Sequence, residues 1–270
     1  MTASSTTDTR IRLIADADDM GCCSSANRAF RDAFQKGILR NGNILIVGDA
    51  CDEAVAMLKE MRGFCLGLHV TVTCEWNTRR WKPLLPPERT RSFIEPDGTM
   101  RRSVMAIHET GARFDEMLTE FQAQLDKARR CGLEITYVSS HMDPSWLFET
   151  SDEHRFGDVV AAWAQKEGLI LRNKYFTSRL PQPPATLTDA IDRFVWRLRH
   201  AAPGLYLTVT HPAYDDDELR SMCYEGSETP GAVARERDMD RRMYMDERVL
   251  AVCRERNIEL VTYADLRAEG

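Results

Sequence analysis

Short apolar runs alternate with amphipathic helical patterns along most of the chain, and this alternation limits the fold more than any other feature. Strands are expected over residues 11–15, 43–47, 64–73, 134–139, 169–171, 205–210 and 258–263. Helical patterns fill the intervals, over residues 24–37, 51–62, 114–132, 157–166, 190–200 and 241–256. We therefore expect an α/β fold with parallel strands, and neither a helical bundle nor a sandwich.

The chain has 270 residues, of which 43% are hydrophobic, so it can bury a full core. No repeat, low-complexity tract or linker divides it. Residues 1–10 are rich in Ser and Thr and are expected to form a flexible tail. Residues 11–270 are expected to form one domain.

Charge and composition exclude several classes of partner. The formal net charge is −6, so there is no basic surplus for nucleic acid. No apolar stretch approaches the roughly 20 residues of a spanning helix, and the N-terminus lacks the apolar core of a signal peptide. The eight cysteines show no CxxC spacing and are expected to be reduced thiols. We expect a cytoplasmic protein, with a homodimer as one candidate assembly.

Unusual polar residues lie in or just after successive predicted strands. The first strand runs into Asp18 and Asp19, and the later ones carry or precede His69, His141 with Asp143, Arg172 and His211. In a parallel barrel the carboxyl ends of the strands converge on one rim, where active sites are built. These side chains are therefore expected to share one pocket.

Each of these residues also has a structural interpretation. An aspartate after a strand can cap the next helix, His69 can be a hydrogen-bonded core histidine, and His211 before a proline can be a turn residue. Together they favour a metal site, because two imidazoles and one carboxylate leave open positions for water and substrate. Such a metal, with an adjacent aspartate as base and a separate histidine as acid, indicates amide or ester hydrolysis.

A long irregular segment, residues 75–102, follows the third predicted strand. It contains five prolines or glycines and two tryptophans, Trp76 and Trp81. Loops of this length within a domain are usually functional or disordered. The two indole rings could form a platform for a ring-shaped ligand, although packing beneath the loop is the more frequent outcome.

Four motifs in order along the chain resemble those of the YdjC-like family of carbohydrate deacetylases. The family's opening NADDFG is similar to DADDMG at residues 16–21, and its GLHLT strand to GLHVT at residues 67–71. Its His-x-Asp motif is similar to residues 141–143, and its His-Pro motif to residues 211–213. A late Arg-Glu-x-Glu segment is loosely matched at residues 237–240.

The resemblance implies an irregular TIM-like (β/α) barrel and a hydrolase that removes an acetyl or related acyl group from a small-molecule N-acyl substrate. It implies metal ligands at Asp19, His69 and His141, with Asp18 as general base and His211 as general acid. The remaining roles, in substrate binding or in orienting these groups, fall to Asp143, Arg172 and Arg237. Two imidazoles suit zinc, whereas magnesium is the ion associated with the family.

The sequence departs from the family pattern near the expected substrate. Asp16 replaces asparagine and Met20 replaces phenylalanine, and the family's further histidines after the His-x-Asp motif are absent. Trp146 and Phe148 stand in that region and would suit a more apolar N-acyl compound. The alternatives are a metal-dependent hydrolase of another amide, ester or phosphoester, a sugar isomerase, and a binding protein that has lost turnover.

Overall fold

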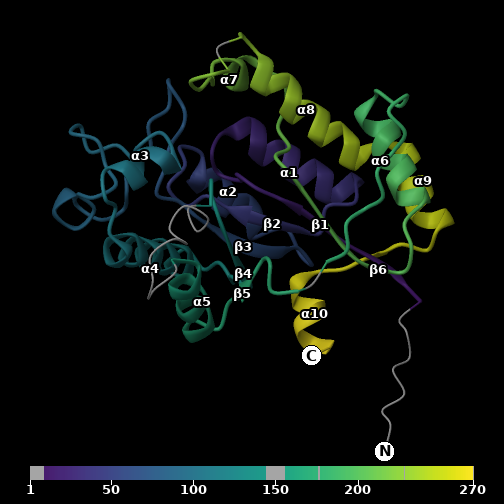
Figure 1. Cartoon of the computed structure of the whole chain (residues 1–270), viewed down its shortest axis with the longest axis horizontal. Coiled ribbons are helices and arrows are strands. Elements are labelled where there is room, and N and C mark those ends of the chain that lie inside the picture. The colour runs from purple at the N-terminus through teal and green to yellow at the C-terminus, as the bar shows by residue number, and fades with distance from the viewer. Residues whose placement is uncertain (1–8, 144–155, 176, 228, 270) are drawn as a thin grey trace, which may run out of the picture.

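The computed structural model describes residues 9–143, 156–175, 177–227 and 229–269, and its strands form two parallel sheets among helices (Figure 1). One sheet has the order β6-β1-β7, and the other has the order β2-β3-β4-β5. The strands are β1 Ile11–Ala17, β2 Asn41–Ile44, β3 Cys65–Val70, β4 Tyr137–Ser140, β5 Ile170–Leu171, β6 Gly204–Thr210 and β7 Glu259–Leu260. The prediction of a single-domain α/β fold with parallel strands is confirmed.

The two sheets meet where β1 ends beside β2. An isolated parallel bridge joins Met20 to Ile44, and the side-chain amide of Asn41 donates to the carbonyl of Ala15 at 3.4 Å. Beyond this junction the strands continue in chain order from β2 to β5. The carboxyl ends of β1 to β6 therefore lie along one continuous rim.

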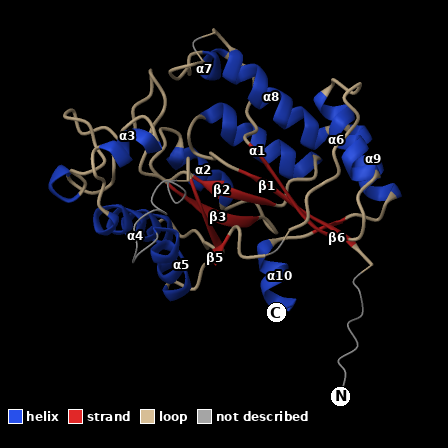
Figure 2. Ribbon diagram, in the orientation of Figure 1, coloured by secondary structure: helices blue, strands red, loops and turns tan. Residues whose placement is uncertain are grey.

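Helices cover both sides of the strands, with α1, α6, α8 and α9 on one side and α4 and α5 on the other (Figure 2). The longer helices are α1 Ser24–Lys36, α2 Cys51–Leu58, α4 Phe114–Arg130, α5 Phe156–Lys166, α6 Ala190–Arg199, α8 Ala232–Met245, α9 Glu247–Glu255 and α10 Tyr263–Glu269. Short turns of helix complete the fold: η1 Pro87–Arg89, α3 Val104–Glu109 and α7 Asp217–Arg220.

The predicted single helix over residues 241–256 is wrong, because the chain breaks between α8 and α9. Asp246 has extended backbone angles (φ −68°, ψ 132°), and its side chain accepts from the backbone N–H of Arg248. An N-cap aspartate therefore starts a new helix inside the apolar periodicity. The predicted last strand is also too long, because α10 begins at Tyr263.

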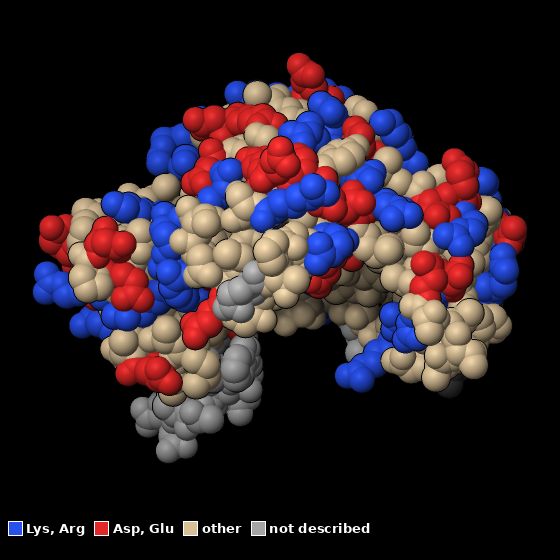
Figure 3. All heavy atoms as spheres, turned by 90° about the horizontal axis from the view of Figure 1, so that it is seen from above, with Lys and Arg blue, Asp and Glu red and all other residues tan. Residues whose placement is uncertain are grey.

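Acidic and basic side chains are interspersed over the face seen in Figure 3. This mixture agrees with the modest net charge of −6. No helix among the described residues is long and apolar enough to cross a bilayer.

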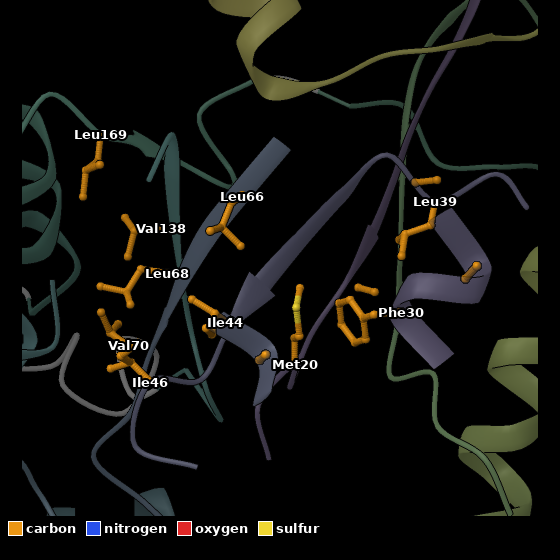
Figure 4. Packing of buried hydrophobic residues seen from close by; sticks show 14 of the residues in the cluster. Met20, Phe30, Leu39, Ile44, Ile46, Leu66, Leu68, Val70, Val138 and Leu169 are labelled. Carbon is orange, nitrogen blue, oxygen red and sulfur yellow. The ribbon is translucent and has the colours of Figure 1, made fainter. Parts of the chain in front are cut away.

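The main core lies between the sheets and the helices that cover them (Figure 4). Met20 and Ile44 pack where the sheets meet, and Leu68 and Val138 continue the row across β3 and β4. All four are buried, and each contributes on the order of 1.5–3 kcal/mol by leaving water. This packing fixes the strands whose ends carry the polar residues.

Candidate active site

The polar residues predicted at the strand ends line one cavity of about 480 Å³. The cavity is lined by the candidate residues named at strand ends, Asp18, Asp19, His69, His141, Asp143, Arg172 and His211, and also by Arg237 from the late family motif. Trp146 lies outside the described residues, as do the first eight residues of the expected tail. The cavity also contains Asp240, from the segment matched at residues 237–240, and four polar residues that the sequence did not single out, Glu75, Ser140, Tyr224 and Glu236.

The aspartate pair lies on a tight turn after β1. Asp19 has φ +73°, in the left-handed region that non-glycine residues seldom adopt, and its carbonyl accepts from the N–H of Cys22 at 3.1 Å. Gly21 follows with φ +93°, and a Cβ there would meet the carbonyl oxygen of Leu45 at 2.9 Å. Backbone strain of this kind is common where a side chain must be aimed at a functional site.

Asp19, His69 and His141 bring three ligand atoms within 4.8 Å of one another, and all three residues are buried. Oδ1 of Asp19 lies 3.4 Å from Nε2 of His69 and 3.2 Å from Nδ1 of His141. This oxygen has no hydrogen bond of good geometry within the described part of the chain. Burying a carboxylate oxygen in this way is costly, and a divalent cation would satisfy it.

The outer nitrogens of both imidazoles are already occupied. Nδ1 of His69 lies 2.8 Å from Oγ of Ser139, and Nε2 of His141 lies 2.9 Å from Oε2 of Glu75. Metal-binding histidines are typically held in this way, because the outer contact fixes the ring and its tautomer. The nitrogens that remain, Nε2 of His69 and Nδ1 of His141, are the two that face Asp19.

Charges around this group favour a cation. Burial disfavours the charge on Asp19, but Arg237 and His141 outweigh it and hold the pKa of this carboxyl well below its usual range. Burial also lowers the pKa of His141, but the carboxylates of Glu75 and Asp19 outweigh it and raise that pKa to about 10. The imidazole therefore lies in a negative environment.

Asp18 is held separately by Arg172 and Asn43. Nη1 of Arg172 donates to both carboxylate oxygens at 2.6 and 2.7 Å, and Nδ2 of Asn43 donates to Oδ1 at 2.8 Å. Burial raises the pKa of Asp18, but the charges of His69 and Arg172 outweigh it and leave that pKa lowered. Asp18 is therefore an ionised carboxylate at neutral pH.

Asp16 is buried near Asp18 and shares two of its partners, Asn43 and Arg172. It accepts from the hydroxyl of Tyr137 at 2.6 Å and from Nδ2 of Asn43 at 3.3 Å, and Nη1 of Arg172 lies 3.9 Å from its Oδ2. Burial, and then the charge on Asp18, raises the pKa of Asp16 to about 7. This carboxyl supports the groups that hold Asp18.

A glycine in β3 lets these supporting groups approach. A Cβ on Gly67 would lie 2.2 Å from Oδ1 of Asn43 and 2.7 Å from Cζ of Tyr137. Both neighbours hold Asp16, and Asn43 also holds Asp18. The close packing of β2, β3 and β4 at this point therefore needs a residue without a side chain.

Arg237 reaches the metal-ligand group from α8. Its Nη2 donates to Oδ2 of Asp19 at 2.8 Å, and its guanidinium lies over the ring of Trp76, 5.2 Å from the centroid. Trp76 is 1% exposed and Trp81 is 2% exposed, so both rings pack within the protein. The edge of Trp81 contacts His141, with 5.7 Å between ring centroids. Trp81 therefore packs beneath the loop, whereas Trp76 packs against Arg237 and also lines the cavity.

His211 lies at the exposed side of the cavity, directly after β6. Its backbone N–H donates to Oδ2 of Asp240 at 2.8 Å. Burial raises the pKa of Asp240, and the contacts with His211 oppose this shift. Asp143 lines the same cavity and is exposed, beside Met142 with φ +46°.

Three ligands of this arrangement can bind a divalent cation. An ionised carboxylate, Asp18, lies beside these ligands, and His211 lies on the exposed side of the same cavity.

A model of the family described as YdjC-like protein matches residues 12–255. The carbohydrate deacetylase of Thermoanaerobacter pseudethanolicus is 24% identical over 269 residues, covering 94% of this chain and 99% of the relative. The carbohydrate deacetylase of Geobacillus stearothermophilus is 25% identical, covering 93% and 96%.

A solved structure shows the same fold. It is the crystal structure of a protein from Enterococcus faecalis V583, named as a proposed cellobiose-phosphate cleavage protein. The TM-score is 0.76 at 20% sequence identity, and the match covers 95% of this chain and 99% of the other.

Proposed function

Because the chain belongs to the YdjC-like family, we propose that it is a metal-dependent hydrolase that removes an acetyl or related acyl group from an N-acylated amino sugar or similar amide. It would act on the C–N bond of a linear amide. The observation that carries the proposal is the convergence of one aspartate and two histidines, Asp19, His69 and His141, beside the ionised Asp18. The names of the curated relatives support the same reaction.

The residues fit a metal ion by their donor set and by the unsatisfied oxygen of Asp19. When bound there, zinc or magnesium would polarise the amide carbonyl and lower the pKa of a water molecule. Two imidazoles favour zinc or another transition ion, whereas magnesium prefers oxygen ligands.

Asp18 would act as the general base. Its lowered pKa keeps it ionised, and Arg172 and Asn43 hold its carboxylate beside the ligand group. Oδ2 of Asp18 lies 4.0 Å from Nε2 of His69, so a water molecule near the metal ligands is within reach of this oxygen. The carboxylate takes a proton from that water molecule, and the oxygen of the water attacks the amide carbon.

His211 would act as the general acid. It lies in the same cavity, and Asp240 holds its backbone. Its imidazole gives a proton to the amide nitrogen as the C–N bond breaks, so that a free amine and a carboxylate leave. Asp143 and Trp146 would contact the substrate, and Arg172 and Arg237 would orient the base and the metal ligand.

The fold proposed for this chemistry is an irregular TIM-like barrel. The bridge between Met20 and Ile44 joins the two sheets, and β5 and β6, which are edge strands of different sheets, do not pair with each other among the described residues. Such a rim would place the strand ends around one pocket. A cytoplasmic location and a homodimer stay predictions.

The test is release of free carboxylate from a panel of N-acyl compounds by the purified protein, before and after chelation and dialysis. Acetate or another acid should appear, and chelation should stop its release until metal is restored. Activity that persists after complete metal removal would overturn the proposal. Turnover of a phosphoester or an isomerised sugar without release of acid would favour the alternative classes.

A further inference from the structure

A second cavity, of about 800 Å³, lies along β6 and is separate from the candidate active site. Its wall includes three arginines, Arg179, Arg193 and Arg197, and no acidic residue among those described. In a chain of net charge −6, a cavity with three cations and no anion is unusual. None of the three arginines forms an ion pair with another described residue.

Two of the arginines are placed by neutral backbone groups, which leave their charge uncompensated, and Arg179 is exposed. Nη1 of Arg193 donates to the carbonyl of Leu187 at 2.9 Å, and Nε of Arg197 donates to the carbonyl of Pro181 at 3.2 Å. The acids nearby on the same helix are engaged elsewhere, since Asp189 caps α6 and Asp192 accepts from Arg248. Unpaired guanidinium groups positioned in this way are suited to phosphate or carboxylate.

Hydroxyl groups and the open side of β6 add further polar contacts. Beyond the bridge between Ser178 and Tyr206, no described strand pairs with this side of β6. Thr210 lines the cavity and is 3% exposed, and its Oγ1 lies near the hydroxyl of Tyr244 but has no hydrogen bond of good geometry among the described residues. A ligand or water in the cavity would supply a better partner for this buried hydroxyl.

The cavity also has apolar surface. Leu207 and Met243 line it with Val209, which is 37% exposed, one of the few large apolar side chains exposed in the described part of the chain. A ligand that fits this lining carries a negative group and also a less polar body. Figure 3 shows a hollow at the lower edge of the molecule, with basic side chains on its right-hand side, the side on which α6 lies in Figure 1.

The two cavities adjoin at the end of β6. Thr210 lines the arginine-rich cavity, and His211, the next residue, lines the candidate active site. We propose that the arginine-rich cavity is a binding site for a small organic anion, a phosphate- or carboxylate-bearing compound of about the size of a sugar phosphate. The anion is either part of an extended substrate or a separate ligand beside the active site.

Binding is tested first, without reference to catalysis, by calorimetric titration with glucose 6-phosphate, glucuronate and uncharged glucose. The two anions should bind saturably, and glucose should bind much more weakly. The variant Arg179→Glu should lose about tenfold or more in affinity for the anions, since a charged hydrogen bond is replaced by repulsion. Arg193→Gln provides a second variant that removes the charge while keeping a donor for the carbonyl of Leu187.

Arg91→Glu is the matched control, because Arg91 is exposed, lies outside both cavities and undergoes the same charge reversal. It should bind the anions as the unaltered protein does, and thermal unfolding should show all variants folded. The proposal is overturned if neither anion binds saturably below about 10 mM, or if Arg179→Glu and Arg193→Gln bind as well as the control.

Kinetics then separate the two sources of the anion, and this part rests on the proposed function. If the anion belongs to the substrate, Arg179→Glu raises KM for a phosphorylated N-acetyl sugar and leaves KM for its neutral counterpart unchanged. If the anion is a separate ligand, free glucose 6-phosphate changes the hydrolysis rate of the neutral compound. A protein that binds the anion but hydrolyses no N-acyl compound would contradict the proposed function and leave the binding site standing.

Discussion

Glu75 accepts a hydrogen bond from His141, with 2.9 Å between Oε2 and Nε2. In the neutral imidazole this contact places the proton on Nε2, so that Nδ1, 3.2 Å from Oδ1 of Asp19, is the nitrogen that would bind a metal. The carboxylate comes from the long segment after β3, and the histidine comes from the end of β4. The loop therefore orients one of the three proposed metal ligands.

Removing this carboxylate should weaken metal binding. We expect Glu75→Ala to lower metal affinity by about 10- to 100-fold, because His141 loses the partner that fixes its tautomer. Glu75→Gln should lose less, because its amide oxygen can still accept from Nε2. Metal titration of the apoprotein measures both. Glu88→Ala, an exposed glutamate of the same segment, is the control, and equal losses in Glu75→Ala and the control would contradict the role.

Replacing the proposed base should stop turnover without loss of the metal, whereas replacing a proposed metal ligand should remove the metal. Asp18→Asn should retain the metal and lose about 100- to 10,000-fold in kcat, because the amide cannot take a proton. His69→Ala and His141→Ala should lose the metal itself. Elemental analysis of each purified variant is compared with its rate of acid release. An Asp18→Asn protein with near-normal kcat would exclude Asp18 as the base.

Arg172 should set the acidic limb of the pH profile. Because the arginine lowers the pKa of Asp18, its removal in Arg172→Gln should raise that pKa. The pH at which kcat/KM falls on the acidic side should therefore move upward. Arg172→Lys keeps the charge and should move the limb less. An unchanged acidic limb in both variants would show that Asp18 does not control it.

Asp16 should make stability depend on pH near neutrality. Its pKa is raised from 3.8 to about 7 in the folded protein, so the folded state holds a proton that the unfolded state releases at lower pH. The stability that this proton contributes is present below about pH 4 and declines as pH rises to about 7. Asp16→Asn, which cannot titrate, should lose less stability than the unaltered protein as pH rises through this range.

Thermal unfolding measured from pH 5 to pH 8 tests the Asp16 prediction. The quantity compared is the change in Tm across this range in the two proteins. Asp158→Asn removes an exposed carboxyl on α5 and serves as the control. Parallel curves for the unaltered protein and Asp16→Asn would show that Asp16 is ionised throughout.

Local patterns in the sequence predict most of the strands and the rim on which the site is built. The run before Asp16, the GLHVT segment and the ends of β4, β5 and β6 are all visible as apolar stretches that stop at polar residues. Their convergence follows from the parallel order of the strands. The family resemblance added the division of roles between Asp18 and Asp19.

Contacts across long sequence separations could not be predicted in the same way. Glu75 meets His141 across 66 positions, and Asn43 meets Asp18 across 25, with no periodic pattern to indicate either pair. The helix break at Asp246 was missed because the apolar periodicity continues past it. A cap depends on backbone angles that the pattern of apolar residues does not encode.

Gly67 has a consequence for any attempt to move this site into another protein. The three proposed ligands and the base could be copied onto the strand ends of a different parallel barrel. Unless the host also has a glycine at the position of Gly67, the amide of Asn43 and the phenol of Tyr137 have no room to reach the aspartates. A successful transplant would therefore have to include this glycine, and the space that it leaves, together with the functional side chains.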